Sequence, residues 1–207
     1  MSVPNKLKGI PMEMTERLSW DQYFILQAML AAAKSKDDST WIGVVLVRDN
    51  SVIATGFNGF PRGVRELALE SWDAHGLDVG PSISGTLDAE RWDQRPEKYR
   101  WVEHGERNAI YQAARLGHST LGTTMYANFT GVPCSDCTRA IIQAGVKEIV
   151  TRDTAHSEVG VGNGVHYHCG DIEETMLHEA GVTWRKVPDF APEYRNNSRT
   201  TTQECPF

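Results

Sequence analysis

The chain has 207 residues, of which 40% are hydrophobic and 23% charged, and this length and composition are typical of one soluble globular domain with a substantial core. Its formal net charge of −6 disfavours a surface built for extended DNA or RNA, although a local basic pocket for a single phosphate is compatible with it. Four cysteines are too few for a disulfide framework, and no apolar run is long enough for a membrane span or a secretory signal, so we expect a cytoplasmic protein.

The beginning of the chain predicts a helix followed by a hairpin. Apolar residues recur at helical spacing from Thr15 to Lys36, so they would share one face of a helix. Two short segments rich in β-branched residues follow, from Trp41 to Val47 and from Ser51 to Phe57. The intervening Arg48-Asp49-Asn50 is typical of a turn, and the two segments are therefore expected to form antiparallel strands.

The stretch from Asn58 to Trp101 lacks sustained periodicity, so we interpret the region around 64–100 as an insertion. Beyond it, helical and strand-like segments alternate, which implies parallel neighbouring strands joined by helical crossovers. The expected elements are helices at 104–116, 134–144 and 171–180, the last stopped by Gly181, and strands at 123–128, 147–151 and 182–187. We expect an α/β fold with a mixed five-stranded sheet in one domain over residues 1–187, and an irregular tail over 188–207.

Candidate metal ligands fall at the starts of two predicted helices, in His104-Gly105-Glu106 and in Pro133-Cys134-Ser135-Asp136-Cys137. His104, Cys134 and Cys137 provide one imidazole and two thiolates, which is a typical ligand count for catalytic zinc and leaves a fourth position for water. A helix N-terminus favours both thiolates electrostatically. Alone, the Cys-x-x-Cys pair is also compatible with a redox motif or half of a structural zinc site, but no second such pair is present. We therefore expect Zn²⁺ as the cofactor.

Glu106 stands two residues after the candidate ligand His104, where it can face a metal-bound water without replacing a ligand. It is the expected proton shuttle. In that role it takes a proton from water, protonates the ring nitrogen next to the attacked carbon of the substrate, and later protonates the leaving ammonia. His-x-Glu followed by Pro-Cys-x-x-Cys is the signature of zinc-dependent nucleobase deaminases. The predicted reaction is therefore hydrolytic deamination, with Glu106 as the catalytic residue.

Three further segments carry a family resemblance, in the order ATGFNGFPRG, EHGERNAIYQAARLG and TRAIIQAGVKEIV. With the metal motifs, they make the chain resemble the cytidine deaminase superfamily, specifically the deoxycytidylate deaminases of bacterial or phage kind, over most of Trp20 to Val187. The resemblance implies the cytidine deaminase-like αβα sandwich, zinc, and conversion of dCMP to dUMP and ammonia. It also implies a homo-oligomer, commonly a hexamer.

The resemblance also implies roles for residues outside the metal motifs. Asn58 is expected to contact the deoxyribose or base, although Asn-Gly is also a common turn pair. Arg62 is a candidate for the 5′-phosphate, with Arg65 nearby, and either is alternatively an ordinary ion-pair partner. His156 stands where relatives place an aromatic that contacts the substrate. Arg115 matches a position that is linked in related enzymes to activation by dCTP and inhibition by dTTP. Alternatively, it is an ordinary arginine at an interface.

Three alternatives stay open at this point. Gly105 replaces the alanine common in the family, so a wider pocket and a 5-methyl- or 5-hydroxymethyl-dCMP substrate are compatible with it, as is a glycine that only suits the helix start. A tRNA adenosine deaminase would use the same zinc chemistry, but it would need a basic RNA surface. A non-enzymatic structural zinc-binding interaction protein would hold its ion with a complete ligand set.

Overall fold

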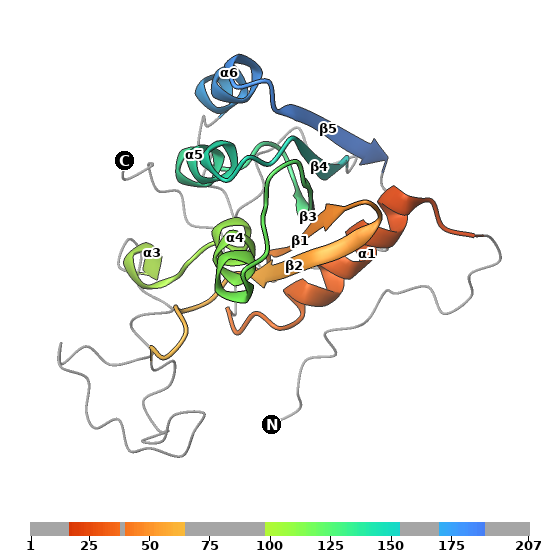
Figure 1. The fold of residues 1–207 in the computed structure, drawn as a ribbon. Helices are drawn as coiled ribbons and strands as arrows, with labels where there is room; N and C mark the ends of the chain where they lie inside the picture. Colours follow the sequence, from red (N-terminus) through yellow and green to blue (C-terminus); the bar gives the residue numbers. More distant parts are fainter. Residues whose placement is uncertain (1–16, 38–39, 65–97, 154–169, 189–207) are drawn as a thin grey trace.

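The computed structural model describes residues 17–37, 40–64, 98–153 and 170–188 (Figure 1). Its strands form one sheet in the order β2-β1-β3-β4-β5. Their bounds are β1 Gly43–Arg48, β2 Ser51–Phe57, β3 Thr124–Thr130, β4 Glu148–Asp153 and β5 Thr183–Pro188. β1 pairs antiparallel with β2 and β3, whereas β3 with β4 and β4 with β5 are parallel. The predicted mixed five-stranded sheet is confirmed.

Helices cover both faces of this sheet (Figure 1). Their bounds are α1 Trp20–Ala32, α3 Lys98–Trp101, α4 Gly105–Leu116, α5 Ser135–Gln143 and α6 Asp171–Glu179. Phe24 and Ile25 of α1 pack on one face in a core cluster with Val45 and Val150. On the other face, a second cluster joins α4, α5 and α6 to β1, β3 and β4. The αβα sandwich is therefore confirmed, and none of the described helices is long and apolar enough to cross a membrane.

The first helix begins at Trp20 rather than at Thr15, because Ser19 caps it. The Ser19 hydroxyl accepts from the backbone N–H of Gln22 at 3.2 Å, and the Gln22 side chain accepts from the backbone N–H of Ser19 at 2.9 Å. This reciprocal pair satisfies two N–H groups that the first turn leaves without helical partners. The apolar periodicity located the helix, and the cap sets its start.

The hairpin turn is one residue shorter than predicted, because Arg48 belongs to β1. The two turn residues, Asp49 and Asn50, have φ angles of 51° and 56°. Two positive φ angles in a two-residue loop match the twist of the flanking strands, and Asn and Asp tolerate this conformation better than most residues. The predicted antiparallel pairing is confirmed.

The predicted insertion contains a helix that its sequence did not indicate, α3 at Lys98–Trp101. Four residues are too few to produce a recognisable periodicity. Residues 65–97 and 189–207 lie outside the described part of the chain, so the domain limits and the tail stay predictions, apart from Pro188, which belongs to β5. The predicted stop of α6 is confirmed, since Gly181 follows its end with a φ of 71°.

Two glycines let a helix approach each face of the sheet closely. A Cβ atom on Gly43 of β1 would lie 1.9 Å from the carbonyl oxygen of Ala28 in α1. A Cβ atom on Gly56 of β2 would lie 2.2 Å from the carbonyl oxygen of Gly105 and 2.4 Å from the backbone nitrogen of Ala109, both in α4. At these two points the helices therefore rest on the backbone of the strands.

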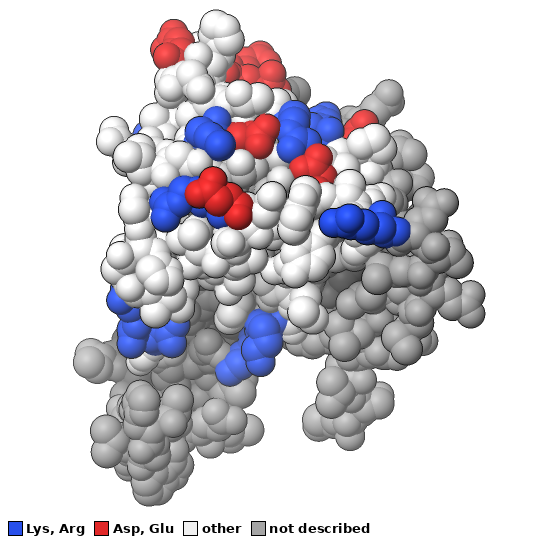
Figure 2. All heavy atoms as spheres, turned by 45° about the vertical axis from the view of Figure 1, so that its right-hand side comes forward, with Lys and Arg blue, Asp and Glu red and all other residues white. Residues whose placement is uncertain are grey.

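Charged residues join α1 to the edge strand β5. Arg185 donates two hydrogen bonds to the carboxylate of Asp21, at 2.7 and 2.8 Å, and a third to Glu148 at 2.9 Å. Tyr126 also donates to Asp21, at 2.9 Å. In the upper part of the face shown in Figure 2, acidic and basic side chains lie next to one another among uncharged residues.

Candidate metal centre and catalytic site

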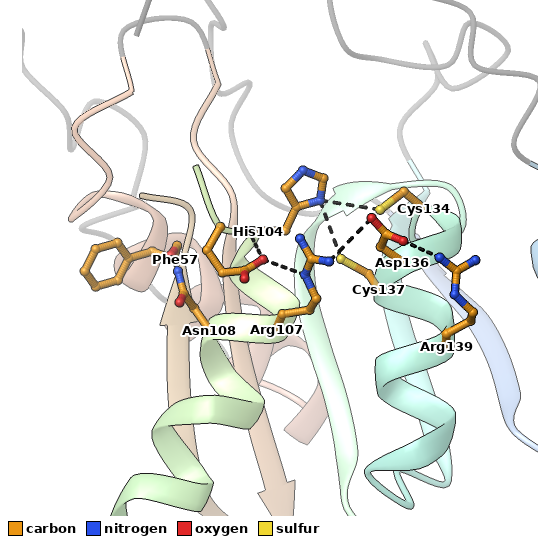
Figure 3. A network of polar contacts seen from close by, with 9 residues as sticks. Phe57, His104, Arg107, Asn108, Cys134, Asp136, Cys137 and Arg139 are labelled. Atoms are coloured by element: carbon orange, nitrogen blue, oxygen red, sulfur yellow. Dashed lines mark hydrogen bonds and ion pairs between the residues drawn. The ribbon is translucent and has the colours of Figure 1, made fainter. Parts of the chain in front are cut away.

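The three predicted metal ligands converge. The Nδ1 atom of His104 lies 3.5 Å from the sulfur of Cys134 and 3.5 Å from the sulfur of Cys137. The ligand atoms of these three residues all lie within 4.8 Å of one another (Figure 3). One nitrogen and two thiolates at this spacing fit zinc, which prefers such donors in a tetrahedral arrangement and leaves one position open when three are supplied.

His104 and Cys134 were predicted to lie inside their helices, whereas in the structure each stands one position before its helix. His104 is the N-cap of α4, with φ −76° and ψ 152°, and Cys134 is the N-cap of α5, with φ −62° and ψ 164°. Neither side chain caps its helix, so both are available to a metal ion. The site thus lies where two positive helix ends meet, which favours thiolate ligands.

Glu106 lies in the first turn of α4 and is buried, with 5% of its surface exposed. Burial raises the pKa of its carboxyl group, and although the positive charge of His104 lowers it, the net change is upward. A hydrogen bond with Cys137 places Glu106 next to the ligand set, of which it is not a member. This is the location expected of a proton shuttle.

The protein alone holds protons that a metal ion must displace. Burial lowers the pKa of His104, but the hydrogen bond to Cys134 and nearby negative charges outweigh it and raise that pKa to about 9. The hydrogen bond with Cys137 lowers the pKa of Cys134 to about 4, although burial opposes this effect. The hydrogen bond with Cys134 and burial raise the pKa of Cys137. At neutral pH, therefore, only Cys134 is already in its metal-binding form.

We accordingly expect zinc uptake near pH 7 to release about two protons per ion, from His104 and Cys137, because zinc ligands must be deprotonated. The apparent zinc affinity should rise with pH through neutrality and fall as the solution becomes more acidic. Calorimetric titration in buffers of different ionisation enthalpy measures the proton release. An observed enthalpy that is the same in all buffers would contradict it.

A charged network supports the site from α4 and α5 (Figure 3). Glu103 accepts a hydrogen bond from the backbone N–H of His104 at 3.0 Å and lies 2.5 Å from the guanidinium of Arg107. Arg107 also lies 3.5 Å from the carboxylate of Asp136, one residue before Cys137. This network links the two ligand-bearing turns. Sequence reasoning missed it, although the i, i+4 spacing of Glu103 and Arg107 was a readable signal.

Asn58 is buried, with 5% of its surface exposed, at the end of β2. Its side chain accepts a hydrogen bond from the backbone N–H of Ile42 at 2.9 Å and donates one to the carbonyl of Thr40 at 2.9 Å. It also donates to Asp37 at 3.2 Å, and Asp37 forms an ion pair with Lys98. The sequence singled out Asn58 but missed Asp37 and Lys98, because nothing in the sequence indicates their pairing across 61 residues.

The two predicted arginines are associated with the C-terminal half of α4, whose N-terminal end bears the metal ligand His104. Arg62 donates a hydrogen bond to Gln112 at 3.1 Å, and Gln112 lies about 10 Å along α4 from Gly105. Arg115 is exposed in the last turn of α4, about 15 Å from the same end. His156 lies outside the described residues.

A side chain at position 105 would point toward Ile42 and the end of β2. A Cβ atom there would lie 3.0 Å from Cγ2 of Ile42, 3.3 Å from the carbonyl oxygen of Ile42 and 3.5 Å from Cα of Phe57. An alanine would require Ile42 to shift by a few tenths of an ångström. This contact favours a packing role at the helix start over a wider pocket.

Comparison with known proteins gives consistent matches. The cytidine and deoxycytidylate deaminase zinc-binding region matches residues 18–152. A probable deoxycytidylate deaminase of Drosophila melanogaster is 34% identical over 65% of this chain and 60% of its own length. The deoxycytidylate deaminase of Mus musculus is 32% identical over 86% of this chain and 83% of its own length.

A solved structure shares the fold. The apo form of dCMP deaminase from the cyanophage S-TIM5 aligns with a TM-score of 0.52 at 22% identity, over 81% of this chain and 96% of that chain. The arrangement of sheet and helices is therefore that of a deaminase-type fold.

Proposed function

Because the chain belongs to the cytidine and deoxycytidylate deaminase family, we propose that it catalyses the zinc-dependent hydrolysis of dCMP to dUMP and ammonia. The observation that carries this proposal is the convergence of His104, Cys134 and Cys137 next to the buried carboxyl group of Glu106. A structural zinc site would need a fourth protein ligand, and among the described residues the group contains three.

In the proposed site, His104, Cys134 and Cys137 hold the ion. Zinc bound there would lower the pKa of water and so supply a nucleophile at neutral pH. The two thiolates lie at the N-terminus of α5, whose positive end stabilises them. The network of Glu103, Arg107 and Asp136 holds the two ligand-bearing turns at a fixed separation.

Glu106 moves the protons. It removes a proton from the attacking water and donates a proton to ring nitrogen N3, while the oxygen bonds to C4 of the cytosine ring. It then takes the remaining proton from the hydroxyl group on C4 and passes it to the amino group, so that the C4–N4 bond breaks, the C4 carbonyl forms and ammonia leaves. Burial suits this task, because the raised pKa lets the carboxyl group accept a proton and return it within one cycle.

We assign substrate contacts to Asn58, Arg62 and His156. Asn58 is supported by its buried position at the end of β2, beside the segment that carries His104. Arg62 would have to leave its exposed hydrogen bond with Gln112 to reach a phosphate, which costs little because water replaces that bond. A single cation suits one phosphate group better than a polyanion.

Regulation and assembly are further parts of the proposal. Arg115 is the residue assigned to control by dCTP and dTTP, and its exposed position in the last turn of α4 leaves it accessible to an effector or to a neighbouring subunit. The proposed assembly is a homo-oligomer such as a hexamer.

The substrate is tested by measuring ammonia release. We expect kcat/KM to be highest for dCMP and lower for deoxycytidine and for 5-methyl- and 5-hydroxymethyl-dCMP, because the proposed site contains a phosphate contact and the space beside Gly105 is filled by Ile42. Equal or better turnover of deoxycytidine would remove the phosphate contact from the proposal. Selective action on tRNA would contradict the choice of a free nucleotide, which the formal net charge of −6 supports.

A further inference from the structure

Three polar side chains are buried together at the end of β2. Asp37, Asn58 and Lys98 are 3%, 5% and 5% exposed. They come from three separate segments, since Asp37 follows α1, Asn58 follows β2 and Lys98 begins α3. Charged side chains are rarely buried to this extent unless they are paired and hydrogen-bonded. The cluster therefore needs an explanation in terms of what it holds in place.

Asp37 connects the other two residues. Its Oδ2 atom lies 2.6 Å from the ammonium nitrogen of Lys98 and accepts a hydrogen bond from Nδ2 of Asn58 at 3.2 Å. Lys98 thus compensates the charge of the carboxylate that holds the Asn58 amide. Removing the ammonium group would leave Asp37 buried without this countercharge, which would displace the carboxylate from its position beside Asn58.

The other contacts of Asn58 determine which way its amide points. Nδ2 also donates to the carbonyl of Thr40, and Oδ1 accepts from the backbone N–H of Ile42. Two acceptors around the nitrogen and a donor at the oxygen are compatible with only one of the two amide orientations. Oδ1 retains a second lone pair, so the side chain can accept one more hydrogen bond, from a donor group of a ligand.

The same segment is joined to the metal-binding turn. The backbone N–H of Gly59 donates to the carbonyl of Glu103 at 3.1 Å, and the N–H of Glu103 donates back at 2.8 Å. Glu103 in turn accepts the hydrogen bond from the backbone N–H of the ligand His104. A continuous set of contacts therefore runs from Lys98 through Asn58 to the metal ligands.

We propose that Lys98 and Asp37 are positioning residues that hold the Asn58 amide in one orientation toward the substrate, at a fixed distance from the metal ligands. This inference rests on the assignment of Asn58 to the substrate in the proposed function. Neither Lys98 nor Asp37 needs to touch the substrate, because the ion pair acts through the hydrogen bond between Asp37 and Asn58.

The test starts from Lys98→Met in the full-length, zinc-loaded protein, which removes the charge and keeps most of the side-chain length. We expect unchanged zinc content and a KM for dCMP that rises about 10- to 100-fold, with a smaller change in kcat, because a misplaced contact group weakens binding. A purely structural role would reduce the active fraction and leave KM unchanged. The control is Lys147→Met, an exposed lysine in the loop between α5 and β4, which should behave as the wild type.

A double-mutant cycle separates this inference from the proposed function. If Lys98 acts through Asn58, adding Lys98→Met to Asn58→Ala should raise KM no further. A normal KM in Lys98→Met, or effects that multiply in the double variant, would overturn the positioning role. A normal KM in Asn58→Ala would instead remove Asn58 from the proposed substrate contacts. If Lys98→Met does not fold, Asp37→Asn combined with Lys98→Met removes both charges and should show the same rise in KM.

Discussion

Glu106→Gln is expected to retain zinc and the native fold while turnover of dCMP falls at least roughly 10²-fold, the scale of a lost general acid–base group. The amide preserves the shape of the side chain, but it cannot accept a proton from water and return it to the ring. Because Glu106 is buried and is not one of the three converging ligands, the substitution should leave the metal site intact.

Zinc per chain, circular dichroism and kcat are measured on the same preparation, so that chemistry is separated from metal loss and misfolding. The matched control is Glu179→Gln, at an exposed position in α6, which should keep wild-type activity. Near-normal turnover in Glu106→Gln with bound zinc would assign the proton shuttle to a different residue.

Replacing either cysteine ligand should have the second large effect. Cys134→Ala and Cys137→Ala are each expected to lower the zinc content from about one ion per chain to well below that value and to abolish activity, because two remaining ligands do not hold zinc firmly. Metal analysis by mass spectrometry after gel filtration measures the loss.

The comparison for these variants is Cys205→Ala, at a cysteine outside the Cys-x-x-Cys motif that supplies the proposed ligands. It should retain both zinc and turnover. If Cys134→Ala or Cys137→Ala kept stoichiometric zinc and wild-type activity, the proposed metal site would be wrong.

The catalytic centre was predictable because its ligands are encoded locally. His104 and Glu106 are two residues apart, Cys134 and Cys137 three apart, and each pair opens a helix whose apolar periodicity is clear. The chemistry of zinc then restricts which pairs belong together. The mixed five-stranded sheet likewise followed from alternating periodic segments, although the Ser19 cap and the shorter hairpin turn changed the element boundaries.

The surroundings of the centre were not predictable, because they depend on long-range contacts. Lys98 stands in a polar stretch without periodicity, and only the fold brings it within 2.6 Å of Asp37. Arg62 was chosen for its charge and its place beside Asn58 in the chain, but its contact with Gln112 depends on how the loop packs on α4. Gly105 was interpreted as a residue that widens the substrate pocket, whereas in the structure the space beside it is occupied by Ile42.

The contact between Gly56 and α4 has a consequence for how the site tolerates sequence change. Where α4 crosses β2, the separation is set by main-chain atoms, since the carbonyl of Gly105 and the nitrogen of Ala109 occupy the space of a side chain. Main-chain dimensions do not vary with the identity of core side chains. Substitutions elsewhere in the core can therefore alter stability while the end of the helix that bears His104 and Glu106 keeps its height above the sheet. A side chain at position 56 would raise that end and separate His104 from the cysteines on α5.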